Sequence, residues 1–305
     1  MSLSILANTF ANNILPILLL GGAGFALGKL LHVDARSLGR VVFYVFSPVL
    51  IFDLLIKNQL KWSEAASVVG FTVTIVLCLG ALAFLFGSLL KLERPALIAI
   101  VITTMFANTG NYGLPLVKFA FGDKALSYAG MYFITTTFMF YTVGVVIASL
   151  GHMNLRQAVS GLLKLPTLYA VFIAMLVIEL GIVLPAPLAR AVDLAAGGTI
   201  PLMLVLLGVQ MTDVILTGNR RALSLSVGLR LFTAPLIGLG LAALYGVQGF
   251  ARQGAVTQAS MPSMVSATVL AAEYQLDSKL IAAVVFVSTL LSPLTLTLLL
   301  VFLGS

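Results

Sequence analysis

The sequence predicts an all-α polytopic membrane protein with ten transmembrane helices in a five-plus-five inverted repeat, in which helices 4 and 9 are broken and cross. Three observations lead to this fold class. Of the 305 residues, 60% are hydrophobic and 9% are charged, whereas a soluble domain carries about 25% charged residues. Long apolar segments follow one another with short connections. The two halves of the chain also carry polar interruptions at equivalent places.

This composition excludes several classes of protein. A chain with so few charged residues cannot cover a water-facing surface, so we exclude a soluble enzyme, a nucleic-acid-binding domain and a disordered protein. The net charge of +7 indicates basic cytoplasmic loops, because Lys and Arg gather on that side of membrane proteins. The single cysteine, Cys78, excludes an intrachain disulfide.

Ten segments are apolar and long enough to cross a bilayer, which takes about 20 helical residues. Their short connections indicate that residues 1–305 form a single integral membrane unit without a soluble domain. The predicted spans cover residues 9–31, 38–56, 65–90, 95–120, 125–150, 164–184, 187–212, 221–246, 250–275 and 278–303.

The basic residues of the loops predict an orientation. Loops after odd-numbered spans hold ten Lys and Arg residues, and loops after even-numbered spans hold six. Because these residues favour the cytoplasm, we expect the odd-numbered loops there and both termini outside. The ten are Lys29, Arg36, Arg40, Lys91, Arg94, Arg156, Lys164, Arg220, Arg221 and Lys279; the six are Lys57, Lys61, Lys118, Lys124, Arg190 and Arg252.

A shift of 154 residues lays the second half of the chain over the first, so that Ala107–Gly110 falls on Met261–Met264. Five spans per half is an odd number, so the second half enters the membrane from the opposite face, as in many secondary transporters. We therefore predict one five-helix repeat over residues 1–150 and another over residues 151–305. Chance matching between apolar segments is the alternative.

The middle of the fourth span is polar and rich in residues that disfavour a helix. Asn108, Gly110, Asn111, Gly113 and Pro115 lie within eight residues. Glycine lowers helix propensity, and proline lacks the N–H that would satisfy a carbonyl four residues back. We predict a broken helix, which is tolerated at membrane depth only against protein or a water-filled cavity. A proline kink with asparagines bonding between helices is the alternative.

The ninth span repeats the arrangement, with Pro262 among four polar side chains. Matching interruptions in both halves are the best sequence indication of a transport site, and half-helix N-termini offer N–H groups to an anion. We therefore predict a substrate site where helices 4 and 9 cross. Its predicted substrate-binding residues are Asn108, Thr109, Asn111, Tyr112, Gly113, Gln258, Ser260, Ser263 and Ser266, and its predicted helix-crossing residues are Gly110, Pro115 and Pro262.

Arg230 lies nine residues into the eighth span, near the expected midplane of the membrane. It can act as a charge partner in three ways: by binding a substrate carboxylate, by pairing with an acid such as Asp213, or by holding the carbonyls of a broken helix. Asp53, Glu179 and Asp193 lie nearer span ends, where we expect interfacial carboxylates. The sequence shows no catalytic constellation, phosphate loop or metal cluster, so we predict no enzyme activity, no metal and no cofactor.

These motifs resemble those of the auxin efflux carrier family, and the resemblance covers essentially the whole chain. Two departures argue against auxin itself as the substrate: Ala107 stands where plant members usually have proline, and the connection between spans 5 and 6 is short. The matching motifs are Asn108–Thr109, Gly113–Leu116, Lys118, Gly122–Asp123, Met261–Pro262, Ala272–Tyr274, Pro48–Phe52 and Ser292–Leu296.

The resemblance implies a compact bacterial member in the inner (plasma) membrane. It implies a scaffold of helices 1, 2, 6 and 7, through which a homodimer forms, and a transport unit of helices 3–5 and 8–10. This unit would slide past the scaffold as an elevator and carry a small organic anion such as malate or malonate. The family's ligand-contact position in span 4 corresponds to Asn108 or Asn111 here.

The sequence therefore predicts a secondary active transporter for a small organic anion, a mono- or dicarboxylate, with membrane lipid and a second copy as partners and no nucleic acid. The alternative is a sodium/proton antiporter on a related crossed-helix fold. That chemistry needs carboxylates near the crossing, and spans 4 and 9 have none near Asn108 or Pro262. Sodium and protons are both candidate coupling ions, and membrane potential alone can also drive export of an anion.

Overall fold

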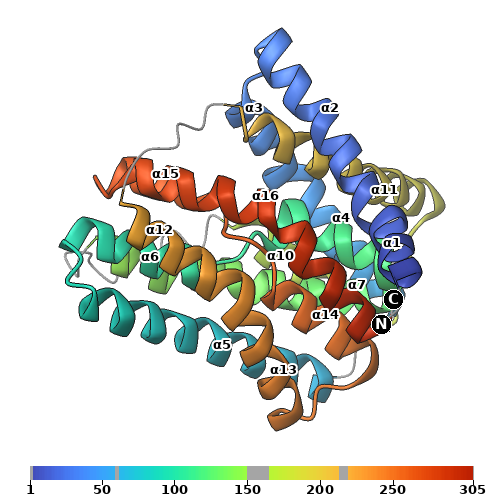
Figure 1. The fold of residues 1–305 in the computed structure, drawn as a ribbon. Helices are drawn as coiled ribbons and strands as arrows, with labels where there is room; N and C mark the ends of the chain where they lie inside the picture. Colours follow the sequence, from blue (N-terminus) through green and yellow to red (C-terminus); the bar gives the residue numbers. More distant parts are fainter. Residues whose placement is uncertain (1–2, 59–61, 150–164, 213–218, 305) are drawn as a thin grey trace.

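The computed structural model describes residues 3–58, 62–149, 165–212 and 219–304, and every named element within these ranges is helical. The N-terminal helix α1 contacts the C-terminal helix α16 (Figure 1). The first half contains α1 (Leu3–Thr9), η1 (Phe10–Ile14), α2 (Leu15–Leu31), α3 (Ala35–Val41), η2 (Val42–Phe46), α4 (Ser47–Asn58), α5 (Trp62–Leu89), α6 (Arg94–Met105), η3 (Thr109–Gly113), α7 (Leu114–Met139), η4 (Phe140–Gly144) and α8 (Val145–Ala148). The second half contains α10 (Pro166–Glu179), α11 (Ala186–Val209), α12 (Arg220–Gly228), η5 (Leu229–Thr233), α13 (Ala234–Leu244), α14 (Gly249–Ala259), α15 (Ala267–Glu273) and α16 (Ser278–Leu303).

Seven helices in the described ranges are long and apolar enough to cross a membrane, and α6 and α10 are shorter apolar helices. The prediction of an all-helical polytopic membrane protein is thus supported, whereas helix length by itself does not yield ten spans. The predicted fourth and ninth spans are interrupted, so their parts fall short of a spanning length. The predicted fourth and fifth spans meet at Gly122, whose φ of 73° and ψ of −166° interrupt α7. The predicted repeat boundary at 150/151 lies outside the described residues.

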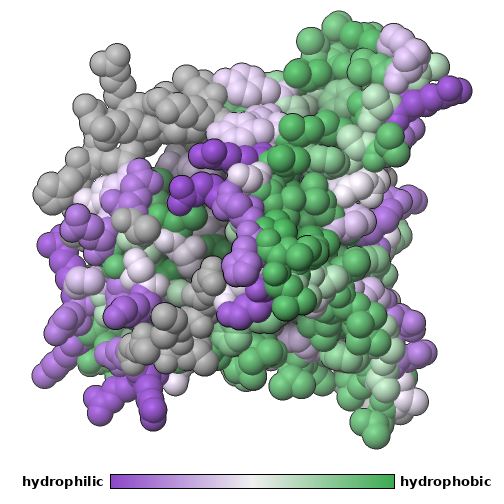
Figure 2. All heavy atoms as spheres, turned by 90° about the horizontal axis from the view of Figure 1, so that it is seen from above, coloured by the Kyte–Doolittle hydropathy of each residue, from purple (hydrophilic) through white to green (hydrophobic). Residues whose placement is uncertain are grey.

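The surface agrees with a membrane location. Large apolar side chains are exposed on several helices, for example Leu194 at 81% and Leu236 at 70%. Figure 2 shows a broad hydrophobic face flanked by hydrophilic residues. Such a surface is unfavourable in water, and an α-helix is able to present it to lipid because its backbone hydrogen bonds are internal.

The buried apolar side chains form two clusters. The smaller cluster joins η2, α4, α10 and α11 to one face of α7. The larger cluster joins α5, α6, α7 and α12 to α16, with further members from η1, α2 and α11. Helices α2 and α11 approach very closely, since a Cβ atom added at Gly208 would lie 1.8 Å from the Gly21 carbonyl oxygen. Glycine is required there because any larger residue would separate the two helices.

Two of the predicted interfacial carboxylates take part in ion pairs. Lys57 Nζ lies 2.8 Å from Asp53 Oδ1 on the same helix and 2.6 Å from Asp193 Oδ1 on α11. These contacts join α4 to α11. At the start of α3, hydrogen bonds from Ser37 and Arg36 lower the pKa of the Asp34 carboxyl group and cap the helix.

Candidate functional site

The two interrupted helices meet at their interruptions. One break covers Phe106–Asn108, between α6 and η3, and the other covers Ser260–Ser266, between α14 and α15. Ala107 and Ser263 form an antiparallel bridge. The Asn108 N–H donates to the Pro262 carbonyl at 2.7 Å, and the Met264 N–H donates to the Phe106 carbonyl at 2.9 Å. Each break thereby satisfies backbone groups of the other, which explains how non-helical backbone persists inside an apolar core.

The first break lies earlier in the chain than the glycines and proline suggested. Residues Thr109–Gly113 form a π-helical turn, in which the Gly113 N–H donates to the Asn108 carbonyl at 3.0 Å. Pro115 then occupies the first turn of α7, where a missing N–H is tolerated. Gly110 and Pro115 therefore follow the break rather than form it.

Polar atoms beside the first break lack partners in the described part of the chain. Asn108 Nδ2, Thr109 Oγ1 and Gln258 Oε1 are buried without a hydrogen bond. A buried polar group without a partner costs about 1–3 kcal/mol. The N–H groups of Gly110 to Tyr112 also precede the first helical hydrogen bond of this segment, and such groups are the usual anion-binding groups of a helix N-terminus. The first break therefore offers hydrogen-bonding capacity to a ligand.

Gln258 extends from α14 to the first break. Its Nε2 donates to the carbonyls of Thr109 at 3.1 Å and Ala129 at 3.3 Å. A Cβ atom added at Gly113 would lie 2.0 Å from Gln258 Oε1. The absence of a side chain at Gly113 thus makes room for this contact between the two halves of the chain.

Asn111 is the half-buried member of the predicted site, and it contacts a different helix. Its Nδ2 donates to Oε1 of Gln210, the C-cap residue that follows α11, at 3.2 Å. Tyr112, next to it, is 1% exposed and its hydroxyl accepts a hydrogen bond from Ser292 on α16 at 3.3 Å. Neighbouring residues of η3 thus face two different parts of the molecule.

Polar groups of the second break are engaged within the protein. The Ser263 N–H donates to Ser288 Oγ at 3.1 Å, and the Ser263 hydroxyl donates to the Thr103 carbonyl at 2.8 Å. The Ser260 hydroxyl donates to the Val256 carbonyl of its own helix at 2.7 Å. Ser266 is exposed.

The N-terminus of α15 is also satisfied locally. The Ala267 N–H donates to the Met264 carbonyl at 3.2 Å, and the Thr268 N–H donates to the Val265 carbonyl at 3.0 Å. This helix has seven residues, so its dipole is short.

Arg230 holds the breaks together through backbone carbonyls. It is fully buried, and its Nε donates to Met261 at 2.8 Å while its Nη1 donates to Thr104 at 2.7 Å. Its Nη2 donates to Ala259. Among the three predicted roles, the described contacts match the holding of broken-helix carbonyls. Asp213 lies outside the described residues.

Sequence reasoning missed a hydroxyl cluster beside Arg230. Ser226 Oγ lies 2.9 Å from Thr103 Oγ1 and 3.0 Å from Thr104 Oγ1, and all three side chains are buried. Ser226 precedes Arg230 by four residues, so both share one helix face. That spacing was the available signal, but nothing in the sequence identifies α6 as the partner of this face.

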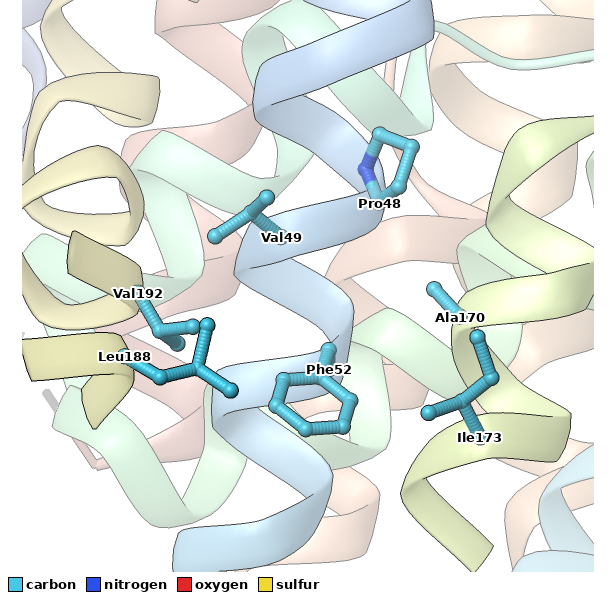
Figure 3. A pocket seen from close by; sticks show the side chains of 7 residues that line it. All are labelled: Pro48, Val49, Phe52, Ala170, Ile173, Leu188 and Val192. Carbon is cyan, nitrogen blue, oxygen red and sulfur yellow. The ribbon is translucent and has the colours of Figure 1, made fainter. Parts of the chain in front are cut away.

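One surface pocket differs from the breaks in the chemistry of its lining. It is a groove of about 280 Å³ between α4, α10 and α11. Figure 3 shows Phe52 between the side chains contributed by α10 and α11. Its lining is apolar throughout, with no group that would recognise an anion: Pro48, Val49, Phe52, Ala170, Ile173, Leu188 and Val192.

Comparisons with known proteins place the chain among membrane transport proteins. The profile of a family described as membrane transport protein matches residues 9–157 and 151–300. An uncharacterized transporter of Methanothermobacter thermautotrophicus is 29% identical over 288 residues, which cover 94% of this chain and 95% of the relative. An uncharacterized transporter of Methanocaldococcus jannaschii is 26% identical over 294 residues, with 93% and 95% covered. The chain therefore belongs to the membrane transport protein family, the auxin efflux carrier family whose motifs its sequence resembles.

Proposed function

We propose that this transporter is a secondary carrier of a small organic anion, a mono- or dicarboxylate, which binds beside the first helix break. The observation that carries the proposal is the set of buried polar atoms without partners there: Asn108 Nδ2 and Thr109 Oγ1. Two hydroxyl or amide donors, together with the N–H groups that open η3, suit the oxygens of a carboxylate.

The charge of this site favours reversible anion binding. Dipoles and amide donors supply partial positive charge, and the full cation that contacts the ends of the broken helices, Arg230, is already hydrogen bonded to three carbonyls. An anion held by partial charges can be released on the other side of the membrane, which a carrier requires. The partial charges recognise any carboxylate, so the size and shape of the site determine which carboxylate binds.

Ten transmembrane helices account for the described elements when each broken helix counts as one span. The fourth span is then α6, η3 and α7 as far as Gly122, and the ninth span is α14 with α15. In this reading the two halves form an inverted repeat, residues 1–150 and 151–305. The direct pairing of Ala107 with Ser263 supports it, because inverted repeats place corresponding broken helices at one midplane site.

The transport unit of helices 3–5 and 8–10 slides past a scaffold of helices 1, 2, 6 and 7, and two scaffolds form a homodimer in the bacterial inner membrane, with both termini outside. The close packing of α2 on α11 and the ion pairs between α4 and α11 support a rigid scaffold. The bond from Asn111 to Gln210 joins η3 to α11. It therefore has to break when one unit moves past the other.

A sodium/proton antiporter would need a titrating carboxylate at the breaks. The polar side chains of the two breaks are amides and hydroxyls, and no cluster of three metal-ligating side chains occurs across the described ranges. The observations therefore favour the anion carrier.

The test is transport current from reconstituted protein on a solid-supported membrane. Mono- and dicarboxylates and indole acids are applied in turn, with and without sodium and a pH gradient. We expect a saturable current with at least one carboxylate, reduced about 10- to 100-fold in Asn108→Ala, because a hydrogen bond to a charged group contributes about 1.5–3 kcal/mol.

The matched control is Thr72→Ala, which removes a buried hydroxyl that donates to its own helix at the Val68 carbonyl at 2.7 Å. It should leave the current unchanged. Currents driven by sodium or pH alone, with every carboxylate silent, would favour the antiporter. Equal currents from Asn108→Ala and the wild type would reject the first break as the binding site. Uptake of a radiolabelled carboxylate covers electroneutral transport.

A further inference from the structure

The carbonyl groups at the ends of α6 and α14 point into the place where the two breaks meet. The last carbonyls of any helix lack helical partners, and they carry the negative end of its dipole. On α6, the Ile102 carbonyl accepts from the Phe106 N–H, the Thr103 carbonyl accepts from the Ser263 hydroxyl, and the Thr104 carbonyl accepts from Arg230. The α6 end therefore depends on Arg230 for one of these acceptors.

The end of α14 depends on the same side chain. The Gln258 carbonyl accepts from the Met261 N–H at 3.3 Å. The carbonyls of Ala259 and Met261 both accept from Arg230. One guanidinium thus uses two nitrogens on the last carbonyls of α6 and α14 and its third nitrogen on the Met261 carbonyl of the second break.

No described carboxylate forms an ion pair with Arg230. A fully buried cation is costly unless it is compensated, and here the compensation consists of carbonyl dipoles. The arrangement has the chemistry of a cation site: several carbonyl oxygens converge on one positive charge. Hard metal cations such as sodium prefer oxygen ligands of this kind.

We infer that Arg230 is a fixed internal cation, which occupies the position where the converging carbonyls of the two breaks would otherwise suit a bound metal cation. Arg230 is a positioning residue: it holds the ends of α6 and α14, and through the paired breaks it holds Asn108 and Thr109. The consequence for coupling rests on the proposed function. Sodium is not required at the breaks, and the substrate is the mobile charge of that site.

The experiment measures the melting temperature, Tm, of the purified full-length protein in detergent, so it needs no knowledge of the substrate. Sodium replaces choline at constant ionic strength. We expect no saturable change in the wild-type Tm. Arg230→Ala should lower Tm by about 10 °C, because three buried carbonyls lose their donors, and guanidinium at millimolar concentration should restore part of the loss.

The matched control is Ser226→Ala, one helical turn earlier on the same face. It removes a buried polar contact to the same helix, α6, without removing charge. Its Tm should fall less and should not respond to guanidinium or sodium. A response of Arg230→Ala no larger than that of Ser226→Ala would overturn the inference, since Arg230 would then be an ordinary packing residue.

A second pair of variants separates charge from size if the alanine variant does not fold. Arg230→Lys keeps the charge and three donors, and Arg230→Met keeps most of the volume without charge. We expect Tm to fall in the order wild type, lysine variant, methionine variant. A methionine variant at least as stable as the lysine variant, or a saturable sodium-induced rise in the wild-type Tm, would reject the fixed cation. Loss of transport with the Tm order intact would instead concern only the proposed function.

Discussion

The two helix breaks look alike in the sequence, but their polar groups differ in whether they have hydrogen-bond partners within the protein. In the second break, Ser263 uses both its N–H and its hydroxyl on partners within the protein, and α15 begins with N–H groups that are already bonded. In the first break, Asn108 Nδ2 and Thr109 Oγ1 are buried without partners in the described chain. One break is internally satisfied and the other has free capacity.

This difference indicates a division of work between the two halves. A buried polar group that already has its partner contributes to stability, whereas one without a partner lowers stability until a ligand or water binds. Under the proposed function, the second break is the structural half of the pair and the first break is the half that binds the substrate. A symmetric site, with equal contributions from both half-helix N-termini, does not fit these contacts.

The largest expected effect comes from closing the space between the breaks. Gly113→Ala places a methyl group where Gln258 Oε1 lies, at 2.0 Å, and should push Gln258 off its two carbonyl partners. We expect a loss of about 3 kcal/mol in stability from overpacking and broken hydrogen bonds, visible as a lower Tm. Gly240→Ala, on α13 with open space around it, is the control and should be neutral or stabilising. Equal Tm values for the two variants would contradict the packing seen here.

Ser263→Ala tests the structural half. It leaves the Thr103 carbonyl without its donor, and we expect a loss of about 2 kcal/mol in the free energy of unfolding. The measurement is Tm together with the KM of the carboxylate that gives the largest wild-type current. KM should stay within about twofold. A large rise in KM with no change in Tm would make Ser263 a ligand contact and would end the distinction between the breaks.

Thr109→Val tests the binding half with almost no change of shape. The variant removes a buried hydroxyl that has no partner, so Tm should stay constant or rise. KM for the same carboxylate should rise about fivefold to tenfold, because a lost hydrogen bond to a ligand costs about 1–1.5 kcal/mol. A lower Tm with unchanged KM would show that this hydroxyl has a structural partner.

The smallest effect is expected at Ser266. Its side chain is exposed at the end of the second break, and the division of work predicts less than about a twofold change in KM and no change in Tm for Ser266→Ala, since surface substitutions are usually close to neutral. The comparison with Thr109→Val in one assay sharpens the asymmetry. An effect on KM as large as that of Thr109→Val would restore a site shared by both breaks.

Much of the molecule could be predicted from the sequence. Membrane location and helical fold follow from local hydropathy, because any long apolar segment must satisfy its backbone internally in lipid. The two interruptions, the place of Gln258 among the polar side chains around Pro262 and the family motifs were also predictable. The position of the first break was not: the π-helical turn at Thr109–Gly113 moves it upstream of Pro115, and no local rule predicts that turn.

By itself, the sequence determined that this is a polytopic membrane transporter with polar interruptions in two spans. Only the tertiary structure decided which polar groups find partners. Arg230 and Ser226 form hydrogen bonds with Thr104 of α6, which lies far from both in the sequence. The Ser263 N–H likewise donates to Ser288 of α16. The physical reason is that a polar side chain in an apolar core must be satisfied, but its partner is set by which helices pack together. The local sequence thus shows which polar side chains need a hydrogen-bond partner, and the packing of the helices determines which atom is that partner.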